Sequence, residues 1–225
     1  MGTGFMEPRR RPAIAEAAFV IVFLFAVEFL ASKVLPLPEN PSEAFRFYAT
    51  AMVRSLEILL LLLYWRFRFG NFSLLGLRGT LAVRGIKSGV RFSLMLGGFA
   101  LFLEVVFRLT LSKSFLGLIA GNPPASPFAL VLAGVILGPL FEELALRGFL
   151  YSAFRTRYGA MLSTLATALV FGALHYKAGA VPLVQVAGGI VFSIAYEKSG
   201  SLAAPLLVHS LGNLAIFSLS YLHLK

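Results

Sequence analysis

Three short patterns of polar residues interrupt apolar stretches of the chain and could support chemistry. They are Glu142-Glu143-Leu-Ala-Leu-Arg147, Phe171-Gly-Ala-Leu-His175 and His209-Ser-Leu-Gly-Asn213. Ionisable groups are costly inside apolar segments of this length, so each is a candidate functional residue. A carboxylate and an imidazole can hold a water molecule and remove its proton, while N–H groups can stabilise an oxyanion. The combination indicates amide hydrolysis by activated water, without a covalent intermediate.

Helix geometry separates the roles of the two glutamates. Successive helical residues lie about 100° apart, so we expect Glu142 and Glu143 to have no shared target. Arg147 follows Glu143 by four residues, the spacing and order that favour an ion pair. This supporting pair would satisfy Glu143 and leave Glu142 available for chemistry. His209 and Asn213 are also four residues apart, which predicts that they share one helix face.

The positions of Glu142 and His175 predict that these residues meet. A short link at Tyr158–Gly159 joins the two helical stretches that carry them. In an antiparallel pair, residues placed symmetrically about the turn lie at equal depth, and positions 142 and 175 are symmetric about this link. Both would lie about 24 Å from the turn, at about 1.5 Å per residue. His209, ten residues past the turn at Lys198–Gly200, would lie at a similar or slightly shallower depth.

A proline lies shortly before the glutamates, in the dipeptide Gly138–Pro139. Proline removes a backbone hydrogen bond and kinks a helix. We expect a kink here that opens the helices to the water that hydrolysis requires.

The composition indicates that these residues lie in a membrane protein. Of the 225 residues, 58% are hydrophobic, and the mean hydropathy is +0.84. Soluble domains are roughly 45–50% apolar. Stretches approaching or exceeding the roughly 20 apolar residues that cross a bilayer fall near 13–35, 46–65, 88–110, 127–154, 160–177, 180–196 and 202–222. We predict an all-α, polytopic integral membrane bundle of about seven transmembrane helices, within a range of six to eight. Residues 1–225 would form a single membrane domain.

The distribution of Lys and Arg predicts the orientation in the membrane. In the loops and near the ends of the spans, twelve basic residues fall on the side of the N-terminus and six fall on the other side. Cytoplasmic loops carry the excess of basic residues, which predicts a multi-pass cell-membrane protein with the N-terminus cytoplasmic and the C-terminus outside. The net charge of +10 has the same explanation. We expect no nucleic-acid partner, because no basic run is interleaved with stacking aromatic residues.

The residue counts exclude several catalytic classes. The chain has neither Cys nor Asp, which excludes a cysteine nucleophile, thiolate zinc ligands and paired aspartates. A transporter would be expected to show paired hydropathy repeats, which the sequence lacks. The HExxH zinc motif is also absent, although one Glu and two His would suit zinc. We favour a site without metal or other cofactor. If a metal is required, its ligands would be Glu142, His175 and His209.

Other charged residues in the spans are expected to be structural. Arg54 and Glu57 are three residues apart, and Glu104 and Arg108 are four apart, which predicts ion pairs within one helix. Glu28 has no partner that spacing can assign.

Taken together, the three patterns resemble the motifs of the CAAX-protease and bacteriocin-processing family of glutamic intramembrane proteases, which includes prenyl endopeptidases. The two glutamates with arginine four positions on, the Phe171–His175 motif and the His209–Asn213 motif occur in the family's order. The resemblance covers roughly residues 126–222, which would form the catalytic helix core. It implies that Glu142 and His175 activate the water, and that His209 and Asn213 form the oxyanion site.

The resemblance also implies the partners. The substrate would be a membrane-associated protein or peptide, with or without an attached lipid, processed within the lipid bilayer. Family members include prenyl-protein processors and bacteriocin-maturation or immunity proteins, and some relatives are scaffolds without protease activity. The alternative is therefore a non-catalytic bacteriocin-immunity or scaffold membrane protein of the same fold. The short chain indicates a prokaryotic member.

Overall fold

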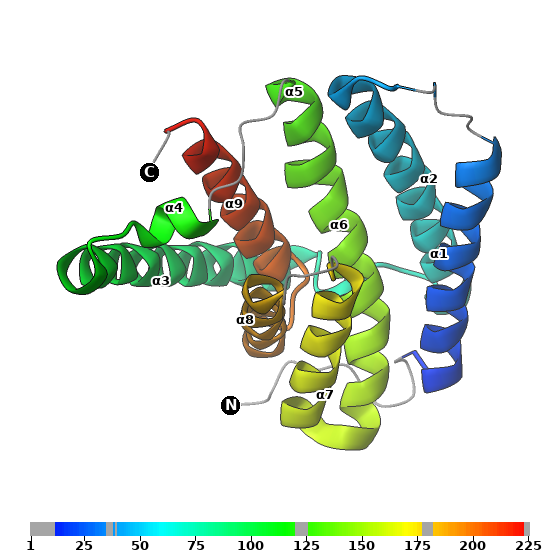
Figure 1. Cartoon of the computed structure of the whole chain (residues 1–225). Coiled ribbons are helices and arrows are strands. Elements are labelled where there is room, and N and C mark those ends of the chain that lie inside the picture. The colour runs from blue at the N-terminus through cyan, green and yellow to red at the C-terminus, as the bar shows by residue number, and fades with distance from the viewer. Residues whose placement is uncertain (1–11, 35–37, 39, 120–125, 177–181, 223–225) are drawn as a thin grey trace.

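The computed structural model describes residues 12–34, 38, 40–119, 126–176 and 182–222, which are mainly helical and contain no strand. The predicted all-α membrane bundle is confirmed (Figure 1). In chain order the helices are α1 (Ile14–Val34), α2 (Glu43–Phe69), η2 (Ser73–Leu75), α3 (Gly79–Leu111), α4 (Phe115–Ile119), α5 (Pro127–Leu130), η3 (Val131–Leu137), α6 (Gly138–Glu143), η4 (Leu144–Tyr151), α7 (Ser152–Leu174), α8 (Leu183–Ser199) and α9 (Ala203–Ser220).

Five of the described helical runs are long and apolar enough to cross a membrane. One of them, Pro127–Leu174, contains two of the predicted spans, because Gly159 (φ 75°, ψ 177°) turns the chain back on itself. A positive φ of this kind suits glycine, which has no Cβ. Figure 1 shows the resulting hairpin, with α7 running back beside η4. The sixth predicted span is α8, which has 17 residues. Each predicted span thus corresponds to a described helix or helix arm.

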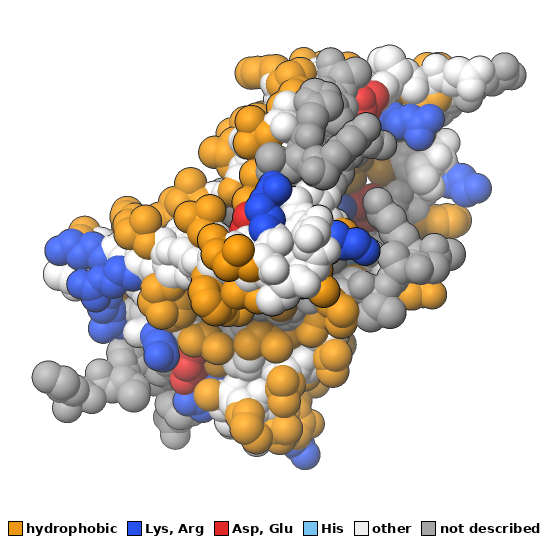
Figure 2. Space-filling model, turned by 60° about the vertical axis from the view of Figure 1, so that its left-hand side comes forward, with side chains coloured by type: hydrophobic (Ala, Val, Ile, Leu, Met, Phe, Trp, Pro, Cys, Tyr) orange, Lys and Arg blue, Asp and Glu red, His pale blue; other side chains and the backbone are white. Residues whose placement is uncertain are grey.

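Apolar side chains cover much of the outer surface, as membrane-facing helices require. Phe25 and Phe29 on α1 and Leu94 and Phe102 on α3 are among many large apolar residues left exposed. Figure 2 shows hydrophobic side chains spread over the visible face, with charged groups confined to patches. The chain is therefore a multi-pass membrane protein.

Helix α3 differs from the prediction in its length and in its direction. It begins at Gly79, whereas the sequence indicated a span from about residue 88, so its first turns carry basic residues. In Figure 1 it runs across the direction of α1, α2 and α6. Its first half packs on α9, where a Cβ at Gly85 would meet the Ser201 hydroxyl at 2.4 Å. A glycine is needed for this close approach.

Two π-helical segments, η3 and η4, lie on either side of α6. The chain remains helical at Gly138 (φ −58°, ψ −59°), and Pro139 lies in the first turn of α6. The irregularity that we expected as a kink thus takes the form of wider turns before and after the glutamates. Such π-helical turns are rare and occur frequently at functional sites.

The core is densest around η4, where every residue from Leu144 to Tyr151 is buried. Trp65 of α2 packs edge-on against Phe149, with ring centroids 5.0 Å apart. The indole Nε1 of Trp65 donates a hydrogen bond of 3.0 Å to the Asn71 carbonyl, which satisfies its one polar atom. This packing fixes η4 and, with it, the position of the adjacent Glu143.

Helices α7 and α8 approach closely at Gly189. A Cβ at this position would lie 2.9 Å from Ala168 Cα and 3.1 Å from Ala168 Cβ. These distances are too short for a side chain unless the two helices separate. The close approach also positions the Gly189 carbonyl, which is a hydrogen-bond acceptor in the site described below.

We expect Gly189→Ala to lower the free energy of unfolding by about 1–3 kcal/mol, because the added methyl group must displace α7. The control is Gly98→Ala on α3, where a Cβ would meet nothing within 4 Å. Alanine has a higher helix propensity than glycine, so Gly98→Ala should leave the free energy of unfolding unchanged or raise it by up to about 1 kcal/mol. Unfolding in mixed detergent micelles measures both. Equal stability of the two variants would contradict the close approach.

Candidate active site

The structure brings together three of the four residues to which the sequence assigned catalytic roles. Glu142 lies near the end of α6, His175 directly follows α7, and His209 lies in α9. The Nε2 atom of His175 is 3.9 Å from Oε1 of Glu142, and the Nε2 atom of His209 is 3.5 Å from Oε2. The two imidazoles therefore face the two oxygens of one carboxylate, and His175 lies beyond direct hydrogen-bonding distance.

The other ring nitrogen of each histidine has a partner of its own. The Nδ1 atom of His175 is 2.9 Å from the Phe171 carbonyl oxygen, and that of His209 is 2.8 Å from Oε1 of Glu143. A carbonyl oxygen and an ionised carboxylate are both hydrogen-bond acceptors and never donors. Each Nδ1 atom therefore carries a proton and donates the hydrogen bond. In a neutral imidazole the Nε2 atom is then an unprotonated acceptor. Both histidines consequently present an acceptor nitrogen toward Glu142.

Behind this set lies a fully buried ion pair. Glu143 and Arg147 are both 0% exposed, and their Oε1 and Nη1 atoms are 3.1 Å apart. Nη2 of Arg147 also donates a 2.9 Å hydrogen bond to the Gly189 carbonyl of α8. Together with the bond from His209, the network links the α6–η4 run to α8 and α9. The predicted i,i+4 pair is present and connects three helical elements.

The expectation that the two glutamates have no common target is wrong. They point in different directions, but His209 lies between them and contacts each through a different ring nitrogen. The spacing within one helix could not reveal this, because the bridging residue lies 66 positions later. Glu143 thus orients a proposed catalytic histidine in addition to pairing with Arg147.

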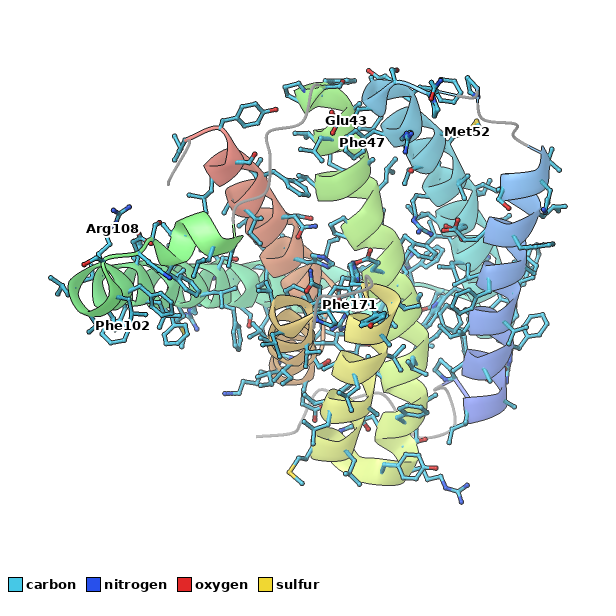
Figure 3. All side chains as sticks on the ribbon, in the orientation of Figure 1. Glu43, Phe47, Met52, Phe102, Arg108 and Phe171 are labelled. Carbon is cyan, nitrogen blue, oxygen red and sulfur yellow. The ribbon has the colours of Figure 1, made fainter. Side chains whose placement is uncertain are left out.

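Aromatic rings hold both histidines in place. The His209 ring stacks on Phe192 (centroids 4.5 Å apart, planes at 18°), and Phe171 lies edge-on to His175 at 4.6 Å and to His209 at 5.5 Å. Figure 3 shows Phe171 in the middle of the bundle. The guanidinium of Arg147 lies 5.3 Å from the Phe192 ring centroid. No motif in the sequence indicated Phe192, which is one of 22 phenylalanines.

Asn213 lies one turn beyond His209 on the same helix, and its side chain has a different partner. Its Nδ2 atom donates a 2.8 Å hydrogen bond to the Gly134 carbonyl of η3. A primary amide has two N–H donors, so one remains for another acceptor. Asn213 thus lies beside the site, and its hydrogen bond links α9 to the π-helical segment η3.

Exposure divides the polar residues into two layers. The side chains of Glu142 and His175 are 21% and 35% exposed, whereas that of His209 is 4% exposed and those of Glu143 and Arg147 are fully buried. A molecule outside the bundle can reach the Glu142–His175 side of the site. The network that positions His209 is sealed from solvent.

A second charged cluster adjoins the site from α1 and α2. The Nη1 atom of Arg54 lies 2.6 Å from Glu28 and 2.5 Å from Glu57, and its guanidinium stacks on the ring of Phe141 at 4.2 Å. The predicted Arg54–Glu57 pair is present, as is the Glu104–Arg108 pair on α3. The structure also gives Glu28 a partner, which lies on another helix and so could not be found from spacing.

The donor set of Glu142, His175 and His209 matches in type the ligands that zinc takes. Among the described ranges of the chain, however, no group of three such side chains has the arrangement of a metal site. We therefore derive no step that passes through a metal.

A helical membrane bundle that holds carboxylates and imidazoles in its interior belongs to the class of polytopic membrane proteins with an intramembrane polar site. A protein-family model described as "Type II CAAX prenyl endopeptidase Rce1-like" matches residues 124–215, the segment that contains all three motifs. Over this segment the chain is similar to the type II CAAX prenyl endopeptidases that the model describes. No curated protein and no solved structure matches the chain.

We expect Glu143→Gln to lower the free energy of unfolding by about 3–5 kcal/mol, because it leaves the buried Arg147 charge without a counter-ion. Glu28→Gln is the matched control. Glu28 is 44% exposed, and loss of its pair with Arg54 should cost less than about 1 kcal/mol. Denaturant titration of both variants in detergent micelles makes the comparison. If Glu143→Gln costs no more than the control, the buried pair does not hold the bundle together.

Proposed function

We propose that the protein is an intramembrane endopeptidase that hydrolyses a peptide bond of a membrane-associated protein or peptide, using a water molecule activated by Glu142 and His175. One observation carries the proposal: the Nε2 atoms of two histidines converge on one partly exposed carboxylate, while both Nδ1 atoms are bonded elsewhere. The similarity of residues 124–215 to type II CAAX prenyl endopeptidases supports the same class of reaction.

The protonation pattern favours activation of water. The Glu142 oxygens and both Nε2 atoms are acceptors when the carboxylate is ionised and the rings are neutral, so they need protons from another source. A water molecule has two O–H donors and can serve Glu142 and His175 at once, across a separation of 3.9 Å. Hydrogen bonds to a carboxylate and an imidazole polarise the water. Transfer of one proton to this pair leaves a hydroxide that can attack a carbonyl carbon.

The remaining steps need an oxyanion site and a proton for the leaving group. Attack on the peptide carbonyl places negative charge on its oxygen, which N–H donors stabilise. In our proposal Asn213 supplies its second amide N–H. His209 takes up a proton from solvent at Nε2 before the attack, donates from this atom to the oxyanion and keeps this proton through the cycle. The proton taken from the water passes to the departing nitrogen as the C–N bond breaks. The products are a carboxylic acid and an amine, and the site returns to its starting state.

The buried layer supports this cycle without touching the substrate. Glu143 accepts from Nδ1 of His209, which fixes the orientation of the ring. Arg147 balances the charge of Glu143 and is itself fixed by the Gly189 carbonyl. Side chains that are already held in place lower the free-energy cost of organising the site during the reaction.

The substrate class follows from where the site lies. The bundle presents an apolar exterior, so a substrate that reaches Glu142 must itself be associated with the membrane. A peptide segment in the bilayer, or a peptide anchored by an attached lipid, meets this requirement.

We expect Glu142→Gln to reduce the rate of peptide cleavage by at least about 10²–10⁴-fold while the protein remains folded. Glutamine keeps the size of the side chain but cannot take a proton from water. The assay compares purified wild type and variant on membrane-presented peptides, both prenylated and unmodified. Glu104→Gln is the control, because Glu104 lies on α3 and pairs with Arg108, apart from the three motifs.

The outcomes separate the alternatives. Equal cleavage by wild type and Glu142→Gln would refute the mechanism. A loss of wild-type activity on chelation that zinc restores would favour the metal-dependent alternative with Glu142, His175 and His209 as ligands. If wild type cleaves no peptide of the panel, the non-catalytic immunity or scaffold function becomes the better hypothesis.

A further inference from the structure

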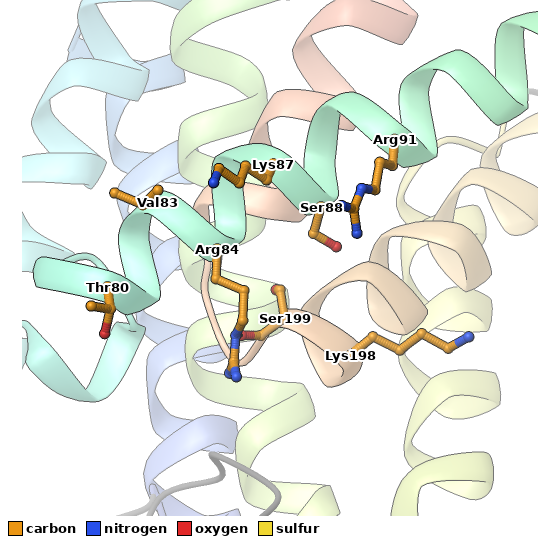
Figure 4. A pocket seen from close by; sticks show the side chains of 8 residues that line it. All are labelled: Thr80, Val83, Arg84, Lys87, Ser88, Arg91, Lys198 and Ser199. Carbon is orange, nitrogen blue, oxygen red and sulfur yellow. The ribbon is translucent and has the colours of Figure 1, made fainter. Parts of the chain in front are cut away.

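A pocket between α3 and the end of α8 collects basic side chains that the proposed protease function does not use. It lies between the first half of α3 and the turn from α8 to α9, and its volume is about 460 Å³. Four cationic residues line it, namely Arg84, Lys87, Arg91 and Lys198 (Figure 4). In Figure 4, Arg84 and Ser88 project from α3 toward the end of α8, where Ser199 and Lys198 lie.

Among the described residues, the four cations have no counter-charge paired with them. Within the part of the chain that the structure describes, no carboxylate forms an ion pair with any of them. The acid next to Lys198 in the sequence, Glu197, is bonded instead to Arg155 (2.9 Å) and to the Tyr151 hydroxyl (2.7 Å). Four like charges around one pocket repel one another, and a bound anion relieves that repulsion.

The donors are suited to a phosphate group. Within the described ranges, Arg84 is bonded only through its Nε atom, in a 2.7 Å hydrogen bond to the Ser199 carbonyl, so its terminal nitrogens have no described partner. Guanidinium groups bind phosphate oxygens in pairs, and lysine ammonium groups add charge. The phosphate could be free in solution or part of a lipid headgroup.

The surroundings of the pocket favour the lipid. Val83 lines the pocket itself, and Ile86 and Val90 lie exposed on the following turns of the same helix. A lipid needs both features, a cationic site for its headgroup and adjacent apolar surface for its acyl chains. Basic pockets between membrane helices bind anionic headgroups.

We propose that this pocket binds the phosphate of an anionic phospholipid, which joins α3 to the α8–α9 turn. Gly85 and Gly89 already hold α3 close to the start of α9, and the ligand would bridge the same contact through Arg91 on one side and Lys198 on the other. Helix α3 lies outside the matched family segment, whereas α9 carries His209. The bound lipid would therefore stabilise the packing of α3 against α9, the helix that carries His209.

The test compares two triple variants with the same loss of charge. The pocket variant carries Lys87→Gln, Arg91→Gln and Lys198→Gln, and leaves Arg84 intact because of its bond to Ser199. The control variant carries Arg66→Gln, Arg78→Gln and Arg157→Gln, three exposed cations outside the pocket. The double variant Lys87→Gln/Lys198→Gln removes only two exposed side chains and serves if the triple variant does not fold.

Delipidated protein in detergent is titrated with dioleoyl-phosphatidylglycerol, dioleoyl-phosphatidylcholine or inorganic phosphate, and binding is followed by native mass spectrometry and the thermal unfolding midpoint. The salt concentration is about 0.15 M, at which exposed charges are screened beyond about 8 Å. We expect wild type to bind phosphatidylglycerol at least about tenfold more tightly than phosphatidylcholine. The pocket variants should lose this preference, and the control should keep it within about threefold.

Three results would overturn the proposal. Equal binding of the two lipids by wild type would remove the evidence for an anionic headgroup. An equal loss in the pocket and control variants would show an effect of overall charge. If inorganic phosphate raises the unfolding midpoint as much as phosphatidylglycerol at the same concentration, the ligand is free phosphate and not a lipid. Because none of these readouts is peptide cleavage, failure here is distinguishable from failure of the proposed protease function.

Discussion

The buried carboxylate of Glu143 needs a counter-ion, because transfer of an isolated ion from water to the protein interior costs many kcal/mol of free energy. Arg147, one turn further along, supplies the opposite charge, but a guanidinium has five N–H donors that also need acceptors. The Gly189 carbonyl of α8 accepts from Arg147, the rings of Phe171 and Phe192 lie against its guanidinium, and His209 bonds to Glu143. Arg147 Nε and Glu143 Oε2 are buried without a hydrogen-bond partner among the described residues. One buried ion pair thus requires three helical elements to meet at a defined point.

Glu142 has a different environment although it is the adjacent residue. It lies on the side of the helix that remains partly exposed, where two imidazoles face it. Adjacent carboxylates can therefore have different surroundings, one fully buried and one partly exposed, because a helix turns about 100° per residue. The π-helical segments before and after them change the local winding, which alters where each side chain points.

The helices outside the matched segment contribute by packing. Trp65 of α2 and Leu75 of η2 fill the core against η4, and α1 also contacts this region. The Arg54 cluster brings a cation beside Phe141. Helix α3 is attached mainly to α9 through glycines that allow backbone contact. The residues of the site lie on the segments from α6 to α9. The first three helices pack against these segments and support their arrangement.

The sequence by itself determined the membrane class, the positions of the helical arms and the turn at Gly159, because hydropathy and glycine chemistry act locally. It also predicted that Glu142 and His175 meet, since an antiparallel hairpin relates them through one short turn. It could not predict the early start of α3 at Gly79, where basic residues break the apolar pattern. Only the tertiary structure decided that His209 lies between both glutamates and that Phe192 stacks on it. Those contacts join residues on separate helices, and their geometry depends on how the helices cross, which no spacing within one helix records.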